Sequence, residues 1–142
     1  MTRLIRNIEK AAKGDMNAEW LLPYTRPKIF KAGDIMMKRG EYAHGAFYLV
    51  TGEVELVELG KTVGPGTLLG EIGLFTPDGL RIATARCKTG VEAARIDYDQ
   101  FKQLYFQNPE FGFYFLRLAT ARLFDNIARL QTQVEQLRPA HA

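Results

Sequence analysis

The spacing of apolar residues changes twice along this chain of 142 residues and divides it into three segments. Residues 2–13 repeat apolar side chains at intervals of three and four, which predicts a short amphipathic helix ending near Gly14. These apolar positions are Leu4, Ile5, Ile8, Ala11 and Ala12. A second apolar patch, Trp20–Leu22, is closed by Pro23. We therefore expect residues 1–22 to form an N-terminal segment of short helices.

Residues 23–108 follow a different pattern, in which short apolar runs alternate with glycine and proline. Many short strands separated by turn residues are typical of a β-barrel or a β-sandwich. Gly60-Lys61 lies between two alternating runs and predicts the tip of a hairpin. After the last of these runs the period becomes helical, and Asp97 or Asp99 is expected to cap a short helix that Asn108-Pro109 interrupts.

The third segment, residues 109–142, is dominated by one helix predicted from about Pro109 to Leu137, with proline in its first turn. Its apolar positions follow an unbroken heptad pattern, which favours a parallel homodimer zipped along this seam. They are Phe113, Leu116, Thr120, Leu123, Ile127, Leu130, Val134 and Leu137. The alternative is a helix that packs only on its own barrel, although such a contact usually shows a wider stripe of period 3.6.

The charge of the chain is nearly balanced, with 19 lysines and arginines against 16 aspartates and glutamates and a net charge of +3. The basic residues are scattered and form no single stripe, which is weak evidence for nucleic-acid binding. Two groups stand in the first and last segments: Arg3, Arg6, Lys10 and Lys13, then Arg117, Arg122 and Arg129. We interpret both groups as solvated helix faces.

The composition indicates a cytoplasmic globular protein. No apolar run approaches the roughly 20 residues that a membrane span needs, and the first residues lack the apolar core of a signal peptide. The single cysteine, Cys87, excludes an internal disulfide and is interpreted as a small buried hydrophobe.

Histidines are too few for a metal-dependent enzyme on a β-barrel, because such sites need a cluster of histidine and carboxylate ligands. His44 and His141 are the only ones, the first near a turn and the second at the chain end. The same shortage speaks against a haem-type gas sensor. We expect no catalytic residues, no metal and no cofactor.

The candidate chemistry lies in the segment Gly66–Thr84. The glycines of Gly70–Gly73 let the backbone approach a ligand closely, and a helical turn starting there would point free N–H groups at an anion. Arg81 follows and can grip a phosphate with two hydrogen bonds. A carboxylate beside a phosphate is explained if Glu71 accepts hydrogen bonds from sugar hydroxyls of the same ligand. The alternative is that Glu71 and Arg81 only pair with each other and the glycines only form turns.

This segment resembles the phosphate-binding cassette of the cyclic-nucleotide-binding domain family. In that family a Gly-Glu-apolar-small-Leu stretch precedes Arg-x-Ala-x, and here these are Gly70–Leu74 and Arg81–Thr84. Further matches in the same order extend the resemblance over roughly residues 20–130: Lys31–Asp34, Arg39–Glu41, Tyr48–Glu53 and Gly64–Gly66. The resemblance implies a mainly β fold with flanking helices, a double-stranded β-helix (jelly-roll) barrel between short N-terminal helices and a long C-terminal helix.

The resemblance also implies a role for each cassette residue. Glu71 would accept the ribose 2′-hydroxyl, Arg81 would hold the cyclic phosphate, and the N–H groups of Ile72, Gly73 and Ala83 would complete the cradle that Gly70 opens. In relatives the long C-terminal helix closes over the barrel, so Asn126 on this helix would offer its amide to the purine edge. An exposed asparagine without that role is the alternative.

Two departures from the family pattern affect the expected ligand. Ile82 stands where many relatives have Ser, Thr or Ala, and the missing hydroxyl costs about 1 kcal/mol and favours cyclic AMP over cyclic GMP. The loop 76–80 lacks the proline commonly found just before the arginine. A degenerate, non-binding dimerisation module of the same fold therefore stays open beside the expected sensor domain, in which the ligand moves the C-terminal helix.

The ends of the chain suggest its setting. Some family members carry a helix-turn-helix domain after the long helix, but only 12 residues follow Leu130 here, so we expect no DNA reading by this chain alone. The basic N-terminal segment resembles one that follows membrane helices in some bacterial proteins, and a membrane segment upstream of Thr2 in a longer parent protein is a further hypothesis.

Overall fold

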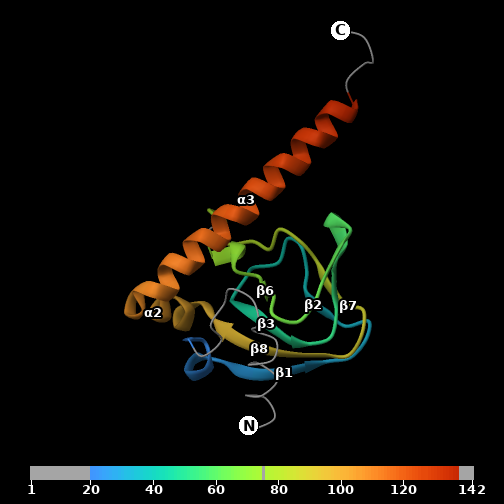
Figure 1. Cartoon of the computed structure of the whole chain (residues 1–142). Coiled ribbons are helices and arrows are strands. Elements are labelled where there is room, and N and C mark those ends of the chain that lie inside the picture. Colours follow the sequence, from blue (N-terminus) through green and yellow to red (C-terminus); the bar gives the residue numbers. More distant parts are fainter. Residues whose placement is uncertain (1–19, 75, 138–142) are drawn as a thin grey trace.

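Two antiparallel four-stranded sheets packed face to face form the body of the protein in a computed structural model, which describes residues 20–74 and 76–137 (Figure 1). The first sheet has the order β1 (Arg26–Phe30), β8 (Val91–Asp97), β3 (Gly45–Thr51) and β6 (Leu68–Leu69). The second has the order β2 (Ile35–Met37), β7 (Ala85–Cys87), β4 (Val54–Leu56) and β5 (Lys61–Val63). Three 3₁₀ turns, η2 (Leu22–Tyr24), η3 (Val57–Leu59) and η4 (Ile72–Leu74), interrupt the loops. The predicted jelly-roll fold is confirmed, while the predicted helix over residues 2–13 lies outside the described residues.

The central strand β3 is buried on both faces, which explains its continuous apolar sequence. Ala46, Tyr48 and Val50 join a cluster under the helices, and Phe47 and Leu49 join a second cluster between the two sheets. Cys87 belongs to this second cluster, where burial raises the pKa of its thiol and leaves it unreactive, as predicted.

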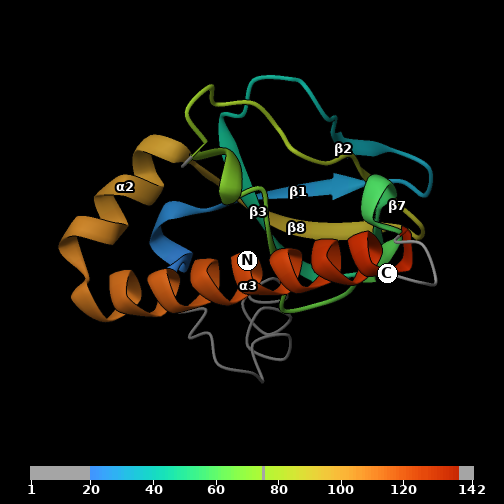
Figure 2. The ribbon, with the colours of Figure 1, turned by 90° about the horizontal axis from the view of Figure 1, so that it is seen from above.

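Helix α2 (Tyr98–Gln107) closes one end of the sandwich (Figure 2). Its N-cap is Asp97, whose backbone N–H donates to the side chain of Gln100 at 3.4 Å. Asn108 then ends the helix and accepts a hydrogen bond at 3.1 Å from the N–H of Phe111 in the first turn of α3. This short connection holds the two helices against each other and directs α3 back across the sheets.

Helix α3 (Pro109–Leu137) spans the predicted range, and its N-terminal turns are anchored by buried Phe111 and Phe115. Its C-terminal part extends away from the sheets (Figure 1). The heptad positions predicted for dimerisation are all exposed: Phe113, Leu116, Thr120, Leu123, Ile127, Leu130, Val134 and Leu137. These positions therefore do not pack on the barrel of the same chain, and their pairing with a second copy stays a prediction. Among the described residues, no helix combines the length and apolar character required to cross a bilayer.

The hairpin between β4 and β5 differs in one detail from the prediction. Gly60-Lys61 was expected as its tip, but Lys61 already pairs with Leu56 across the two strands. The connection is the 3₁₀ turn Val57–Leu59 followed by Gly60, which adopts the left-handed conformation at φ 60°. Four residues close the hairpin, so Glu58 lies at its tip.

Candidate functional site

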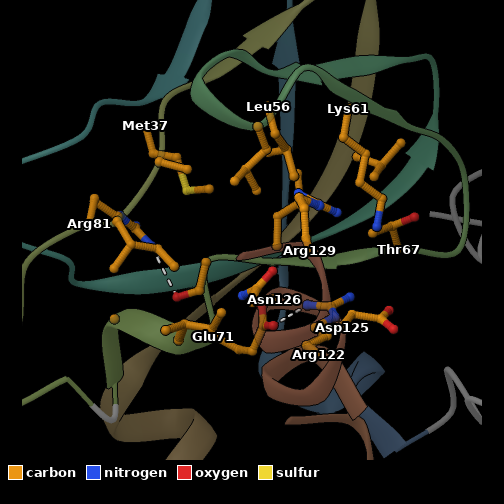
Figure 3. Close-up of a pocket in the computed structure, with 18 residues that line it drawn as sticks. Met37, Leu56, Lys61, Thr67, Glu71, Arg81, Arg122, Asp125, Asn126 and Arg129 are labelled. Atoms are coloured by element: carbon orange, nitrogen blue, oxygen red, sulfur yellow. Dashed lines mark hydrogen bonds and ion pairs between the residues drawn. The ribbon is translucent and has the colours of Figure 1, made fainter. Parts of the chain in front are cut away.

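A pocket opens between the two sheets under α3, and all eight predicted binding residues line it (Figure 3). These are Gly70, Glu71, Ile72, Gly73, Arg81, Ile82, Ala83 and Asn126. The apolar part of the wall comes from Met37, Leu56, Leu59, Val63 and Leu69. The fold therefore brings the whole predicted cassette and the predicted helix residue to one cavity.

Arg81 is held from behind by main-chain carbonyls. Its Nη2 donates to the oxygen of Gly45 at 2.8 Å, and its Nη1 donates to the oxygen of Gly70 at 3.1 Å. Tyr98 supports the same corner, since its hydroxyl donates to Gly70 at 2.7 Å and lies 3.4 Å from Nη1. Burial lowers the pKa of Arg81, yet an arginine stays charged at neutral pH. Because a guanidinium has five N–H donors, others are left for an anion in the pocket.

Gly70 makes this arrangement sterically feasible. Its φ of +87° lies in the left-handed region, and a Cβ built on it would stand 2.5 Å from Nη1 of Arg81. Only glycine allows the arginine to approach the chain this closely. The close approach seen at Gly70 is to Arg81, and the predicted approach of the cassette glycines to a ligand stays a prediction.

The amides around Arg81 form a potential anion cradle. Its own N–H donates to the oxygen of Glu41 at 2.8 Å, but in the described part of the chain the N–H groups of Ile82 and Ala83 have no acceptor. Ala83 is buried against the pocket, where an unpaired amide is costly unless a ligand accepts from it. On the facing wall, the turn η4 begins at Ile72, so its first N–H groups have no partner within the turn.

Glu71 is the buried charge of the site, with 2% of its surface exposed. Its Oε1 accepts a hydrogen bond from Nη1 of Arg122 on α3. The same nitrogen also donates to the main-chain oxygen of Leu68 at 2.7 Å. Glu71 and Arg81 therefore do not pair with each other, and that alternative is wrong. Oε2 of Glu71 is left to accept from a ligand hydroxyl.

The helix contributes more to the pocket than the sequence indicated. Arg122, Asp125, Asn126 and Arg129 all line it, and Figure 3 shows Asn126 and Arg129 projecting into the cavity. Interpreting Arg122 and Arg129 as part of a solvated face was wrong. Their spacing at i, i+3, i+4 and i+7 places them on one face of the helix, which is the signal that could have found them.

Arg129 carries an unsatisfied donor. Its Nη1 is buried and has no hydrogen-bond partner among the described residues. With Lys61, Arg81 and Arg122, it makes four cationic side chains around the pocket, against the two carboxylates of Glu71 and Asp125. An anionic or acceptor-rich ligand would balance this charge. Among the described residues, no three side chains of His, Cys, Asp and Glu come close enough to hold a metal ion.

The jelly roll encloses a pocket that α3 covers. Donors suited to an anion lie there beside a buried carboxylate that can accept from a sugar hydroxyl, an arrangement typical of a domain that binds a small phosphorylated ligand. The comparison with known families agrees, because residues 27–108 match the family model of the cyclic nucleotide-binding domain. The chain belongs to that family, which is of the regulatory type and is not an enzyme family.

Individual relatives support this assignment. The chain is 33% identical over 104 residues to the cAMP-activated global transcriptional regulator CRP of Salmonella typhimurium, covering 68% of this chain and 50% of that protein. The corresponding regulator of Haemophilus influenzae is 31% identical over 134 residues, covering 89% of this chain and 59% of its own length. The chain thus spans between half and three fifths of these relatives.

A solved structure shows the same fold over nearly all of its own length. It comes from work on a cyclic-GMP-dependent signalling pathway that regulates bacterial phytopathogenesis, and it is 28% identical with a TM-score of 0.68. The match covers 78% of this chain and 95% of that one.

Proposed function

We propose that this domain binds a cyclic nucleotide, cyclic AMP in preference to cyclic GMP, and transmits its binding through α3. The observation that carries the proposal is the convergence of three groups on one cavity: Arg81, the unpaired N–H groups of Ile82 and Ala83, and the buried carboxylate of Glu71. In this proposal the arginine and the amides take the phosphate, and Oε2 of Glu71 takes the ribose 2′-hydroxyl.

The preference for adenine rests on two side chains at the rim of the pocket. Ile82 is 47% exposed and offers no hydroxyl to a guanine amino group. Asn126 is half-buried on the pocket wall, and an asparagine amide suits the donor and acceptor edge of adenine. The name of the Salmonella relative includes activation by cAMP, which agrees with this choice.

Signal output is proposed to run through the ion pair of Glu71 and Arg122. The acid that would receive the sugar is already bound to the helix that covers the pocket, so a ligand that alters one alters the other. We further propose that α3 pairs with a second copy of the chain along its exposed heptad seam.

Calorimetric titration with cyclic AMP and cyclic GMP tests the proposal. Saturation at about 100 times Kd should also stabilise the protein by about 2.7 kcal/mol in thermal melting. Arg81→Ala should abolish both effects. The matched control is Arg86→Ala, because Arg86 is exposed on β7 and, within the described part of the chain, pairs only with Glu55 at 2.7 Å. If the unmodified domain binds neither nucleotide, the non-binding dimerisation module replaces the sensor.

A further inference from the structure

Thr84 ends the segment Arg81–Thr84, and each of its polar atoms takes part in a hydrogen bond. Its N–H donates to Oε1 of Glu58 at 2.7 Å, and its hydroxyl donates to Oε2 of the same carboxylate at 2.7 Å. Its oxygen accepts from the N–H of Val57 at 2.9 Å, and its hydroxyl accepts from the N–H of Arg39 at 3.1 Å. A single carboxylate at the hairpin tip thus grips Thr84 by two atoms.

The other end of this segment is anchored as well. The N–H of Arg81 donates to Glu41, and its oxygen accepts from the N–H of Gly40 at 3.0 Å. Between these two fixed ends stand Ile82 and Ala83, whose N–H groups have no acceptor in the described structure. The two anchors fix the backbone on either side of these amides, which belong to residues that line the pocket, and the anchor at Thr84 depends on Glu58.

Glu58 itself does not line the pocket, but two residues of the same hairpin do. Leu59, which follows Glu58, and Leu56, two residues before it, form part of the apolar wall. The carboxylate therefore joins the wall that would face the base to the segment that would face the phosphate. Hydrogen bonds from the N–H and then the hydroxyl of Thr84 lower the pKa of Glu58 below its usual value, with a smaller contribution from Arg39. Glu58 is therefore ionised at neutral pH, and both hydrogen bonds from Thr84 are charge-assisted.

We propose that Glu58 is a positioning residue of the nucleotide site, which acts through Thr84 to fix the Ile82 and Ala83 amides and the hairpin wall in their binding arrangement. This inference rests on the proposed function. An exposed carboxylate contributes little to the fold, whereas preorganising a cradle lowers the entropy that the ligand would otherwise lose on ordering it. Its effect should therefore fall on affinity and leave the stability of the free protein nearly unchanged.

Substitutions at Glu58 separate these effects. We expect Glu58→Ala to weaken nucleotide binding about tenfold, the equivalent of one charge-assisted hydrogen bond, and Glu58→Gln to weaken it less because the amide oxygen still accepts. The melting temperature of the nucleotide-free variants should stay near that of the unmodified domain. The matched control is Glu55→Ala, since Glu55 lies on the same hairpin and pairs with exposed Arg86. Its affinity should be unchanged.

Thr84 supplies the second half of the test. Thr84→Ser keeps the hydroxyl and should bind normally, whereas Thr84→Val should weaken binding, and combining it with Glu58→Ala should add less than the sum of the two losses. In the nucleotide-free protein, Glu58→Ala should speed hydrogen exchange of the Thr84 amide. Unmodified domain that binds no nucleotide refutes the proposed function and this role with it. Tight binding that Glu58→Ala leaves unchanged refutes the role of Glu58 alone.

Discussion

Replacing Arg122 with methionine removes the cation that faces the buried carboxylate of Glu71. Methionine keeps much of the length of the side chain, so the change is mainly one of charge and hydrogen bonding. Glu71 is 2% exposed and the Arg122 side chain is 27% exposed. Breaking a buried pair by removing one partner costs about 3–5 kcal/mol, because the remaining charge is uncompensated. Since one side of Arg122 reaches solvent, we expect a loss near the lower end, about 3 kcal/mol.

Equilibrium unfolding in urea measures this loss of free energy directly. In thermal unfolding, the same loss should lower the melting temperature by about 10 °C for a chain of this length. The double variant Glu71→Gln with Arg122→Met removes the orphan charge and should recover most of the stability. Arg86→Met is the matched control, because its exposed pair with Glu55 should contribute no more than about 1 kcal/mol.

The double variant also tests the link between stability and function. It should fold nearly as well as the unmodified domain, yet bind nucleotide poorly, because the acceptor proposed for the ribose hydroxyl has lost its charge. A loss below about 0.5 kcal/mol in the single Arg122 variant, which is typical of unremarkable surface positions, would refute the argument that this pair is buried and uncompensated without its cation.

Two further predictions concern the core and the dimer. Tyr48→Phe should stabilise the domain by about 1 kcal/mol in urea unfolding, because the Tyr48 hydroxyl is buried without a hydrogen-bond partner among the described residues and burial raises its pKa to about 12. A loss of stability would mean that the hydroxyl has a partner. Leu123→Asp should convert a dimer into a monomer in sedimentation, since it places a charge in the proposed apolar seam. The control Thr132→Asp, at an exposed helix position off the seam, should stay dimeric, and an unchanged mass in the Leu123 variant would refute the zipper.

The cassette could be predicted from the sequence because its residues lie close together along the chain. Gly70, Glu71 and Arg81 fall within one short stretch. Their spacing alone leaves plain turns and a simple ion pair open, and the resemblance to the family cassette decides for a binding site. The structure brings them to a common cavity, as the resemblance implied. The change from strand to helix after Asp97 could also be predicted, because a capping residue coincides there with a change in the spacing of apolar residues.

The partners of those residues could not be predicted, because they come from distant elements. Arg122 reaches Glu71 across 51 positions, and Glu58 reaches Thr84 across 26. The spacing of Arg122, Asn126 and Arg129 places them on one helix face, but the same spacing is compatible with a solvated face until the helix is placed over the pocket. The hairpin tip was similarly misjudged, because the strand pairing of Lys61 depends on how the two runs align.

Helix α3 presents two different faces, and this explains how a ligand signal could leave the barrel. Arg122, Asn126 and Arg129 share the face over the pocket, while the exposed heptad positions share another. At 3.6 residues per turn these two faces lie about 110° apart around the axis. They therefore do not compete for the same contacts, yet they belong to one rigid rod. In the proposed function, a ligand that moves the Glu71 and Arg122 pair would turn or tilt α3 and its seam together, so the proposed dimer would change without contacting the ligand.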